Sequence, residues 1–246
     1  MEKIVCENLF CERGDFSLHL EELHIHEGEK IALLGENGCG KTTLLQALNG
    51  VLPIGDGRLS YSSALWGGEA RLGKNVSSTE RSNFMAYLPQ EADVLFNLTV
   101  TELLALSLDN ARLVQEKERE NILHATEMVT FQERIFHSLS VGEKRRAMVA
   151  RVLCRDCPFI LLDEPTAPLD LRHATQLMRY MAGMPRTIIA AIHDINLAIR
   201  YFDRFLLMKK GKILFDRSKD CLHVDELEEI YGIGLTNHGG YFIPAL

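Results

Sequence analysis

The sequence contains no apolar run that approaches the ~20 residues needed to cross a lipid bilayer. Its N-terminus, Met1-Glu2-Lys3-Ile4, also lacks the apolar core of a secretory signal peptide. No internal repeat and no sustained heptad pattern is visible. The 46% hydrophobic and 25% charged residues among 246 are ordinary values for a globular protein. We therefore expect a folded chain with a large core that does not itself cross a membrane.

An excess of positive charge is also missing, since 27 Lys and Arg stand against 34 Asp and Glu, for a net charge of -7. This balance argues against non-specific nucleic-acid binding, and we expect no nucleic-acid partner. The 6 cysteines follow no disulfide framework, which suits a reducing compartment. Cys154 and Cys157 have the spacing of a metal-binding pair, but no second pair or nearby His-x-x-x-His accompanies them. We interpret them as cysteines at a helix end.

Residues 35–42, Gly-Glu-Asn-Gly-Cys-Gly-Lys-Thr, match the phosphate-binding pattern G-x-x-x-x-G-K-[ST]. An apolar stretch of strand length precedes them at 30–34, and a stretch typical of a helix follows at 43–48. The glycines allow the loop to curl with its amide groups pointing inward, where they and the helix N-terminus bind phosphate oxygens. We expect Lys41 to contact the β- and γ-phosphates of a nucleoside triphosphate, and the Thr42 hydroxyl to contact Mg²⁺. The residues assigned to nucleotide binding in this segment are Gly35, Asn37, Gly38, Cys39, Gly40, Lys41, Thr42 and Thr43.

A second segment, residues 158–165, ends an apolar run in two adjacent carboxylates. Its uninterrupted apolar residues between prolines are typical of a parallel strand that is buried on both faces. Because ligands bind at the carboxyl ends of such strands, we expect Asp163 to join the Mg²⁺ shell. Glu164, one residue further into the cleft, is our candidate for the general base that accepts a proton from the water attacking the γ-phosphate.

Several shorter segments gain meaning from their order along the chain. They are Tyr87-Leu88-Pro89-Gln90, Leu139-Ser140-Val141-Gly142-Glu143, Ala167-Pro168-Leu169-Asp170 and Ile188-Ile189-Ala190-Ala191-Ile192-His193. Taken singly, each has an ordinary explanation, such as a turn, a helix cap or a structural histidine at a strand end. With these segments in this order after the phosphate loop, the chain resembles the ATP-binding subunit of ABC transporters over essentially its whole length.

The resemblance implies a role for each segment. The catalytic residues that it implies are Gln90 of the Q-loop, Glu164 and the switch histidine His193, and the Mg²⁺ ligands are Thr42, Gln90 and Asp163. In that family two subunits face head to tail, so Ser140 and Gly142 of the signature segment would contact the ATP of the partner subunit. Asp170 of the D-loop is also assigned to nucleotide binding. ATP and Mg²⁺ are therefore the expected cofactors, and a second copy of the chain is an expected partner.

The chain departs from the family pattern at two places. Val141 stands where the family has glycine, which restricts the backbone near the partner's nucleotide, and Glu143 replaces glutamine. A positive φ at residue 141 would strain the valine and lower turnover, whereas a helical φ would tolerate it. The aromatic residue that stacks on adenine would fall near residues 11–13, where none is present, and Phe10, Phe16 or the guanidinium of Arg13 remain as substitutes.

We expect an α/β fold, a P-loop NTPase core with a mixed sheet, an N-terminal antiparallel β part and an all-helical insert. The expected domains are a nucleotide-binding α/β core, residues 1–94 and 157–246, and a helical insert, residues 95–156, that carries the signature segment. Within them the pattern predicts strands over 3–35, a loop over 66–83, a capping box at 99–102, a helix over 114–129, and a helix over 224–231 before an extended end.

A chain of this type without a membrane span must deliver its work to another chain. We expect it to be a peripheral subunit at the cytoplasmic face of the cell membrane, bound to an integral membrane permease. The segments 86–90 and 227–232 resemble those of importers for iron-siderophore, haem and vitamin B12, which implies a separate substrate-binding protein. Import of free metal ions and export of haem for cytochrome c maturation stay open. The alternative from another class is a soluble ABC-type ATPase in a scaffold or assembly complex.

Overall fold

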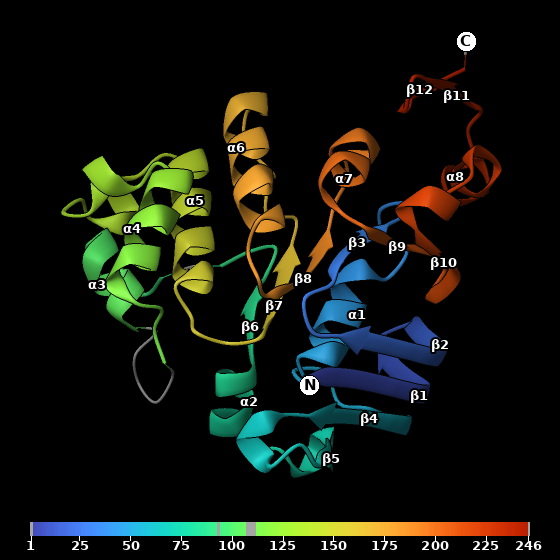
Figure 1. Cartoon of the computed structure of the whole chain (residues 1–246), viewed down its shortest axis with the longest axis horizontal. Coiled ribbons are helices and arrows are strands. Elements are labelled where there is room, and N and C mark those ends of the chain that lie inside the picture. The colour runs from blue at the N-terminus through green and yellow to red at the C-terminus, as the bar shows by residue number, and fades with distance from the viewer. Residues whose placement is uncertain (1, 93, 107–111, 246) are drawn as a thin grey trace.

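The computed structural model describes residues 2–92, 94–106 and 112–245, and it contains a 10-stranded sheet in the order β5-β4-β1-β2-β10-β9-β3-β8-β7-β6. The strands of this sheet are β1 (Lys3–Arg13), β2 (Phe16–His26), β3 (Lys30–Leu34), β4 (Asp56–Ser62), β5 (Ala70–Leu72), β6 (Met85–Leu88), β7 (Phe159–Asp163), β8 (Thr187–Ala191), β9 (Arg204–Lys209) and β10 (Lys212–Ser218). A separate antiparallel pair consists of β11 (Leu235–His238) and β12 (Tyr241–Pro244). The helices are α1 (Lys41–Leu48), α2 (Ser78–Phe84), α3 (Val100–Ala105), α4 (Glu116–Ala125), α5 (Val141–Leu153), α6 (Leu171–Ala182), α7 (Ile195–Tyr201) and α8 (Val224–Tyr231). Figure 1 shows α3 to α5 on one side of the molecule and α8 with β11 and β12 on the other.

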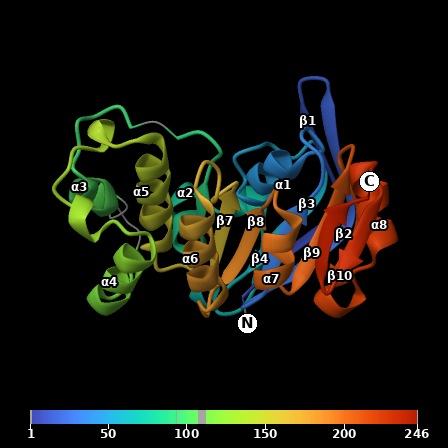
Figure 2. The ribbon, with the colours of Figure 1, turned by 90° about the horizontal axis from the view of Figure 1, so that it is seen from above.

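The central strands of the sheet are buried on both faces. β3, β7 and β8 consist entirely of buried residues, and they pair in parallel, as continuous apolar runs predict. Along β3, Ile31 and Leu33 belong to a hydrophobic cluster that includes α1, whereas Ala32 and Leu34 belong to a second cluster with α5, α6, α7 and α8. Because successive side chains of a strand point to opposite faces, helices must cover both faces of the sheet (Figure 2). The predicted α/β class with a mixed sheet is therefore confirmed, and β1, β2, β4 and β5 form its antiparallel part.

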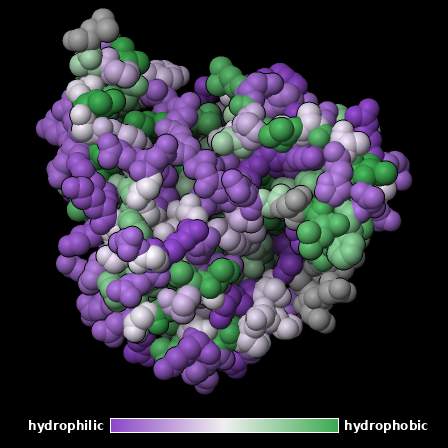
Figure 3. Space-filling model, turned by 180° about the vertical axis from the view of Figure 1, so that it is seen from behind, coloured by the Kyte–Doolittle hydropathy of each residue, from purple (hydrophilic) through white to green (hydrophobic). Residues whose placement is uncertain are grey.

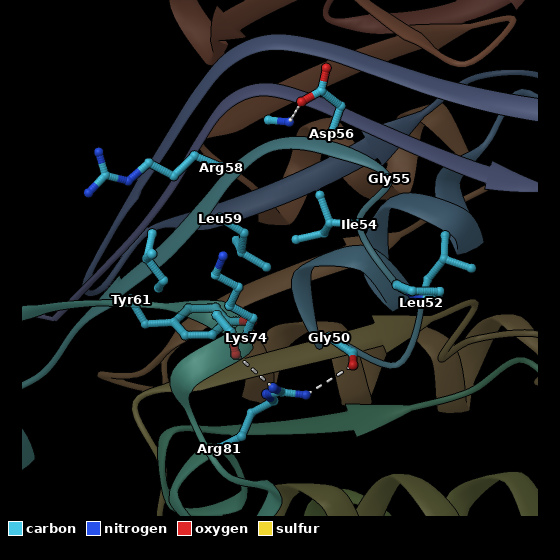
Figure 4. Close-up of a pocket in the computed structure, with 14 residues that line it drawn as sticks. Gly50, Leu52, Ile54, Gly55, Asp56, Arg58, Leu59, Tyr61, Lys74 and Arg81 are labelled. Atoms are coloured by element: carbon cyan, nitrogen blue, oxygen red, sulfur yellow. Dashed lines mark hydrogen bonds between the residues drawn. The ribbon is translucent and has the colours of Figure 1, made fainter.

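The predicted loop over 66–83 is wrong, because this stretch contains β5 and α2. A capping box between Ser77 and Glu80 starts α2, and the guanidinium of Arg81 donates hydrogen bonds to the carbonyls of Gly50 and Gly73, at 3.0 Å each (Figure 4). The ring of Trp66 stacks on Phe84 with centroids 5.5 Å apart. This polar segment is thus held in a defined structure by hydrogen bonds of Arg81 to backbone carbonyls and by ring stacking, which local composition does not reveal. A cavity of about 620 Å³ lies beside Arg81, and none of the residues assigned to nucleotide binding lines it.

Helices dominate the described part of the predicted insert, although residues 107–111 of it lie outside the described residues. The predicted capping box is confirmed, because Thr99 accepts from the Glu102 amide and Glu102 accepts from the Thr99 amide. The predicted helix over 114–129 is too long, since α4 spans only Glu116–Ala125. It stops where the Thr126 hydroxyl donates to the Ile122 carbonyl and Glu127 adopts a φ of 52°. Side chains of this segment share one hydrophobic cluster with the sheet.

The predicted helix at 224–231 is confirmed as α8, and the extended end after it is paired as β11 and β12. None of the helices within the described residues is long and apolar enough to span a membrane. The face shown in Figure 3 is mostly hydrophilic, with hydrophobic side chains in scattered groups.

Candidate functional site

The phosphate loop joins the end of β3 to the start of α1, with a backbone that only glycine adopts easily. Gly35 has a φ of 151° and Gly40 a φ of 112°. A Cβ atom on Gly35 would lie 2.3 Å from the Met208 carbonyl oxygen, and one on Gly40 would lie 2.8 Å from the ring of Phe16. The glycine positions therefore reflect both backbone conformation and close packing against β9 and β2.

The side chain of Lys41 lies inside the loop. Its Nζ atom donates hydrogen bonds to the carbonyls of Gly35, at 2.6 Å, and Glu36, at 3.0 Å. Cys39 beside it is buried, and burial raises the pKa of its thiol, although Lys41 opposes the shift. The ammonium group is thus held at the loop by two backbone carbonyls, and the thiol stays protonated near neutral pH.

Asp163, at the end of β7, is suited to a metal ion. It is only 1% exposed, and neither oxygen of its carboxylate has a hydrogen-bond partner among the described residues. Burial raises the pKa of the Asp163 carboxyl, while the nearby Thr42 hydroxyl lowers it. A buried, unpartnered carboxylate beside a hydroxyl fits a hard cation such as Mg²⁺, which prefers oxygen ligands. The described residues contain no group of three or more His, Cys, Asp or Glu that could by itself hold a metal ion.

Glu164 and His193 meet at the mouth of the loop. His193 Nε2 lies 2.6 Å from Glu164 Oε1, and Glu164 has a φ of 52°, which is unusual for a residue other than glycine. A pocket of about 660 Å³ opens here, and the residues that line it are Arg13, Phe16, Asn37, Gly38, Gly40, Lys41, Thr42, Thr43, Gln90, Glu164 and His193. The structure therefore brings together the predicted catalytic residues Gln90, Glu164 and His193 with the phosphate loop.

The predicted signature and D-loop residues do not line this pocket. Ser140 is the N-cap of α5, and its amide donates to Glu143 at 2.7 Å in a capping box. Asp170 is the N-cap of α6, where it accepts from the His173 amide at 2.9 Å, and this hydrogen bond lowers the pKa of Asp170. Gly142 lies in the first turn of α5. None of these three residues therefore belongs to the chain's own pocket at the phosphate loop.

Val141 does not strain the backbone, because it is the first residue of α5 and is not among the described residues with positive φ. Its side chain is 72% exposed. Of the open candidates for base stacking, Phe16 and Arg13 line the pocket, whereas Phe10 packs against His19 with ring centroids 4.7 Å apart.

Two residues that the sequence analysis did not single out touch the site. Arg145 of α5 donates hydrogen bonds to the carbonyls of Pro89, Gln90, Asp163 and Glu164. Tyr231 of α8 accepts a hydrogen bond from the Gly35 amide at 3.2 Å. No local sequence pattern assigns either residue to the site, although Tyr231 lies in the importer-like segment 227–232, because both contacts join segments far apart in the chain.

Comparisons with known proteins identify the family and the fold of the chain. The family model described as "ABC transporter" matches residues 18–167. The petrobactin import ATP-binding protein of Bacillus anthracis is 32% identical, over 89% of this chain and 82% of the relative. The hemin import ATP-binding protein of Vibrio cholerae is 34% identical, over 83% of this chain and 81% of the relative. The solved dimeric structure of a bacterial ABC transporter cassette superposes with a TM-score of 0.73 and 22% identity, over 88% of this chain and 98% of that chain, which shows the same fold.

Proposed function

The chain belongs to the ABC transporter family of ATP-binding and ATP-hydrolysing proteins, and we propose that it powers an importer of a metal chelate, haem or cobalamin. Support for import comes from relatives named for hemin and petrobactin import, which align over most of this chain. In this proposal the chain is a peripheral subunit at the cytoplasmic face of the cell membrane. It works with an integral membrane permease and a separate substrate-binding protein.

The pocket at the phosphate loop is the proposed ATP site. The loop amides and Lys41 bind the β- and γ-phosphates. Phe16 and Arg13 line the pocket, where either can stack on the adenine ring. Thr42, Gln90 and Asp163 are the residues that would hold Mg²⁺, whose chemistry is to neutralise charge on the phosphate oxygens. The buried and unpartnered carboxylate of Asp163 supports this assignment.

The contact of 2.6 Å between Glu164 and His193 beside the phosphate loop is the observation that carries the hydrolytic mechanism. Glu164 accepts a proton from the water that attacks the γ-phosphate, and His193 orients the Glu164 carboxylate. Gln90, on the same pocket wall, positions that water. Arg145 fixes the backbone of both Gln90 and Glu164.

Glu164→Gln tests this mechanism directly. We expect ATP affinity to be retained and turnover to fall by at least about a hundredfold, because the base is lost and the phosphate contacts are not. Glu21→Gln, at an exposed position of β2, is the matched control and should leave both quantities unchanged. Unchanged hydrolysis in the Glu164→Gln chain would remove Glu164 from the role of base.

A head-to-tail dimer is proposed because Ser140, Gly142 and Asp170 lie outside the chain's own pocket. Ser140 and Asp170 are exposed at the N-termini of α5 and α6. A partner's ATP placed against these N-termini would accept hydrogen bonds from their free amides. Sedimentation of the Glu164→Gln chain with and without ATP tests this step, and a monomer under both conditions would contradict it.

The proposed seat of the permease is a groove of about 560 Å³ between α2 and β6 on one side and α5 on the other. It is lined by residues that include Val51, Tyr87, Pro89, Met148 and Arg151. The side chain of Val51 is 62% exposed, and the Tyr87 and Pro89 wall leads directly into Gln90. An element seated here therefore reaches the catalytic pocket through one short segment of backbone.

Purification of the tagged chain from gently solubilised membranes tests the transporter class. We expect a many-spanning membrane protein to co-purify and to raise the ATPase rate. Val51→Asp should abolish co-purification without changing the ATP affinity of the isolated chain, whereas Leu214→Asp, an exposed apolar position on β10, should not. Recovery of soluble partners alone would favour the scaffold ATPase instead.

A further inference from the structure

The C-terminal part of the chain touches the phosphate loop. The hydroxyl of Tyr231, at the end of α8, accepts the hydrogen bond of the Gly35 amide, and the Gly35 carbonyl accepts that of Lys41 Nζ. The peptide groups on both sides of Gly35 are thus engaged, one by α8 and one by the phosphate-binding lysine. Burial raises the pKa of Tyr231 to about 12, so the hydroxyl stays neutral at any physiological pH.

The same part of the chain also touches the helix that follows His193. Asn196, in the first turn of α7, donates through Nδ2 to the Phe242 carbonyl at 2.9 Å and accepts through Oδ1 from the Phe242 amide at 2.7 Å. Phe242 lies on β12, and its side chain is buried in the cluster that also contains Ala198 of α7. Asn196 follows His193 by three positions along the chain, so β12 is attached to the helix that begins directly after the switch histidine.

Contacts within the C-terminal part join these two attachment points. The Glu228 carboxylate on α8 accepts a hydrogen bond from the Leu235 amide on β11 at 2.6 Å. The Gly234 carbonyl accepts from the Ala245 amide at 2.8 Å, which closes the hairpin. Leu227 of α8 lies in the same hydrophobic cluster as Phe242. The helix and the hairpin therefore pack as a unit rather than as two independent ends.

We propose that residues 224–245 form a C-terminal strap that positions the phosphate loop and the switch histidine relative to each other, with Tyr231 and Asn196 as its positioning residues. The inference rests on the proposed ATP site. Neither residue lines the ATP pocket, so each acts through another group. Tyr231 sets the orientation of the Gly35 peptide and with it the entry of the loop, while Asn196 sets the position of α7 behind His193.

Tyr231→Phe removes one hydroxyl and keeps the buried ring. We expect the Kd for ATP of the full chain to rise by about threefold to tenfold, the range of one neutral hydrogen bond, and kcat to stay within about twofold. The matched control is Tyr201→Phe on α7, since the buried hydroxyl of Tyr201 has no hydrogen-bond partner within the described ranges. A loss of stability alone would lower the active fraction without moving Kd, so the Kd distinguishes positioning from a structural role.

Asn196→Ala should change kcat rather than Kd, the reverse of Tyr231→Phe. We expect the Kd for ATP to be unchanged and kcat, normalised to bound ATP, to fall by about threefold or more. Asn237→Ala is its control, because the Asn237 side chain accepts its hydrogen bond from the Gly240 amide within the hairpin turn. The ratio of kcat to the Kd for ATP should fall less in the double variant Tyr231→Phe with Asn196→Ala than the product of the two single falls, because both residues act through one strap.

The outcomes separate this inference from the proposed function. A wild-type chain that fails to bind ATP would defeat the proposed ATP site. A wild-type chain that binds ATP, together with Tyr231→Phe that binds it as tightly as Tyr201→Phe, would overturn the strap. A fall in the ratio of kcat to Kd in the double variant that equals the product of the two single falls would also overturn it, because the two contacts would then be independent.

Discussion

Arg145 connects the helical segment to both walls of the catalytic pocket, and its replacement should affect stability and turnover together. Its guanidinium donates to the carbonyls of Pro89 and Gln90 at 2.9 and 3.0 Å, and to those of Asp163 and Glu164. The residue is 8% exposed. Burial lowers the pKa of Arg145, and the carboxylates of Asp163 and Glu164 oppose that shift. One side chain thus satisfies carbonyl groups from two separate segments of the site.

The size of the effect of Arg145→Met follows from these contacts. Loss of the four hydrogen bonds at about 1 kcal/mol each would lower the free energy of unfolding by about 4 kcal/mol. Methionine no longer buries a charge, which offsets part of the loss, so we expect about 2–4 kcal/mol. Arg145→Lys should cost about half as much, because one ammonium reaches one of the two carbonyl pairs.

Turnover should fall further than stability explains. Without Arg145 the backbone of Glu164 and Gln90 is free to shift, and a displacement of about 1 Å in a reacting group costs on the order of a hundredfold in rate. We expect kcat to drop by about tenfold to a hundredfold. The Kd for ATP should stay within about threefold, because within the described residues the hydrogen bonds of Arg145 go to residues 89, 90, 163 and 164 and not to the phosphate loop. Urea unfolding, followed by the fluorescence of the single tryptophan, Trp66, measures the free energy of unfolding. Single-turnover hydrolysis measures the rate of the chemical step.

The neighbouring Arg146→Met is the matched control. Arg146 is also 8% exposed, but within the described residues the hydrogen bonds to the carbonyls of Pro89, Gln90, Asp163 and Glu164 all come from Arg145 and none from Arg146. If Arg145→Met and Arg146→Met lowered the unfolding free energy and kcat equally, burial of a guanidinium rather than the carbonyl contacts would be responsible. The reasoning above would then be refuted.

Three other regions give predictions of their own. Val141→Gly should not raise turnover, because Val141 is helical and unstrained, and it should lower the free energy of unfolding by about 0.5–1 kcal/mol; a faster ATPase would contradict this. Hydrogen bonds from Ser77 and Thr99 lower the pKa of Glu80 and Glu102, so these groups stabilise the fold fully above their unfolded-state pKa of about 4.3 and lose that contribution as the pH falls through the folded-state pKa. The loss of unfolding free energy between about pH 5 and about pH 2 should therefore be smaller in the E80Q/E102Q chain than in the wild type, and equal losses would exclude this cause. Because burial raises the pKa of the Cys39 thiol, maleimide at pH 7 should label the exposed Cys221 first and Cys39 slowly, with ATP slowing Cys39 further; mass spectrometry of the labelled peptides checks the order.

Local sequence patterns predicted much of this fold because the relevant energy is local. The strands β3, β7 and β8 are continuous apolar runs, and the capping box at Thr99 and the helix α8 follow from residues within a few positions of each other. The family and its ATPase activity were also predicted from the sequence and are confirmed. The segment at 66–83 was missed because its order depends on Arg81 and on stacking between Trp66 and Phe84, contacts that polar composition conceals.

The candidate site also contains parts that local sequence predicts and parts that it does not. Its phosphate loop and acidic strand end are local patterns, whereas the groups that fix their relative position act over large sequence separations. Arg145 reaches the Gln90 carbonyl across 55 residues, Tyr231 reaches Gly35 across 196, and Asn196 reaches Phe242 across 46. Hydrogen bonds to backbone atoms leave no pattern in the sequence of the accepting or donating segment, since every residue has a carbonyl and nearly every residue an amide. Sequence patterns therefore predict the groups expected to contact ATP. The residues that fix the relative positions of those groups are identified only from the folded structure, in which the sheet brings the segments together.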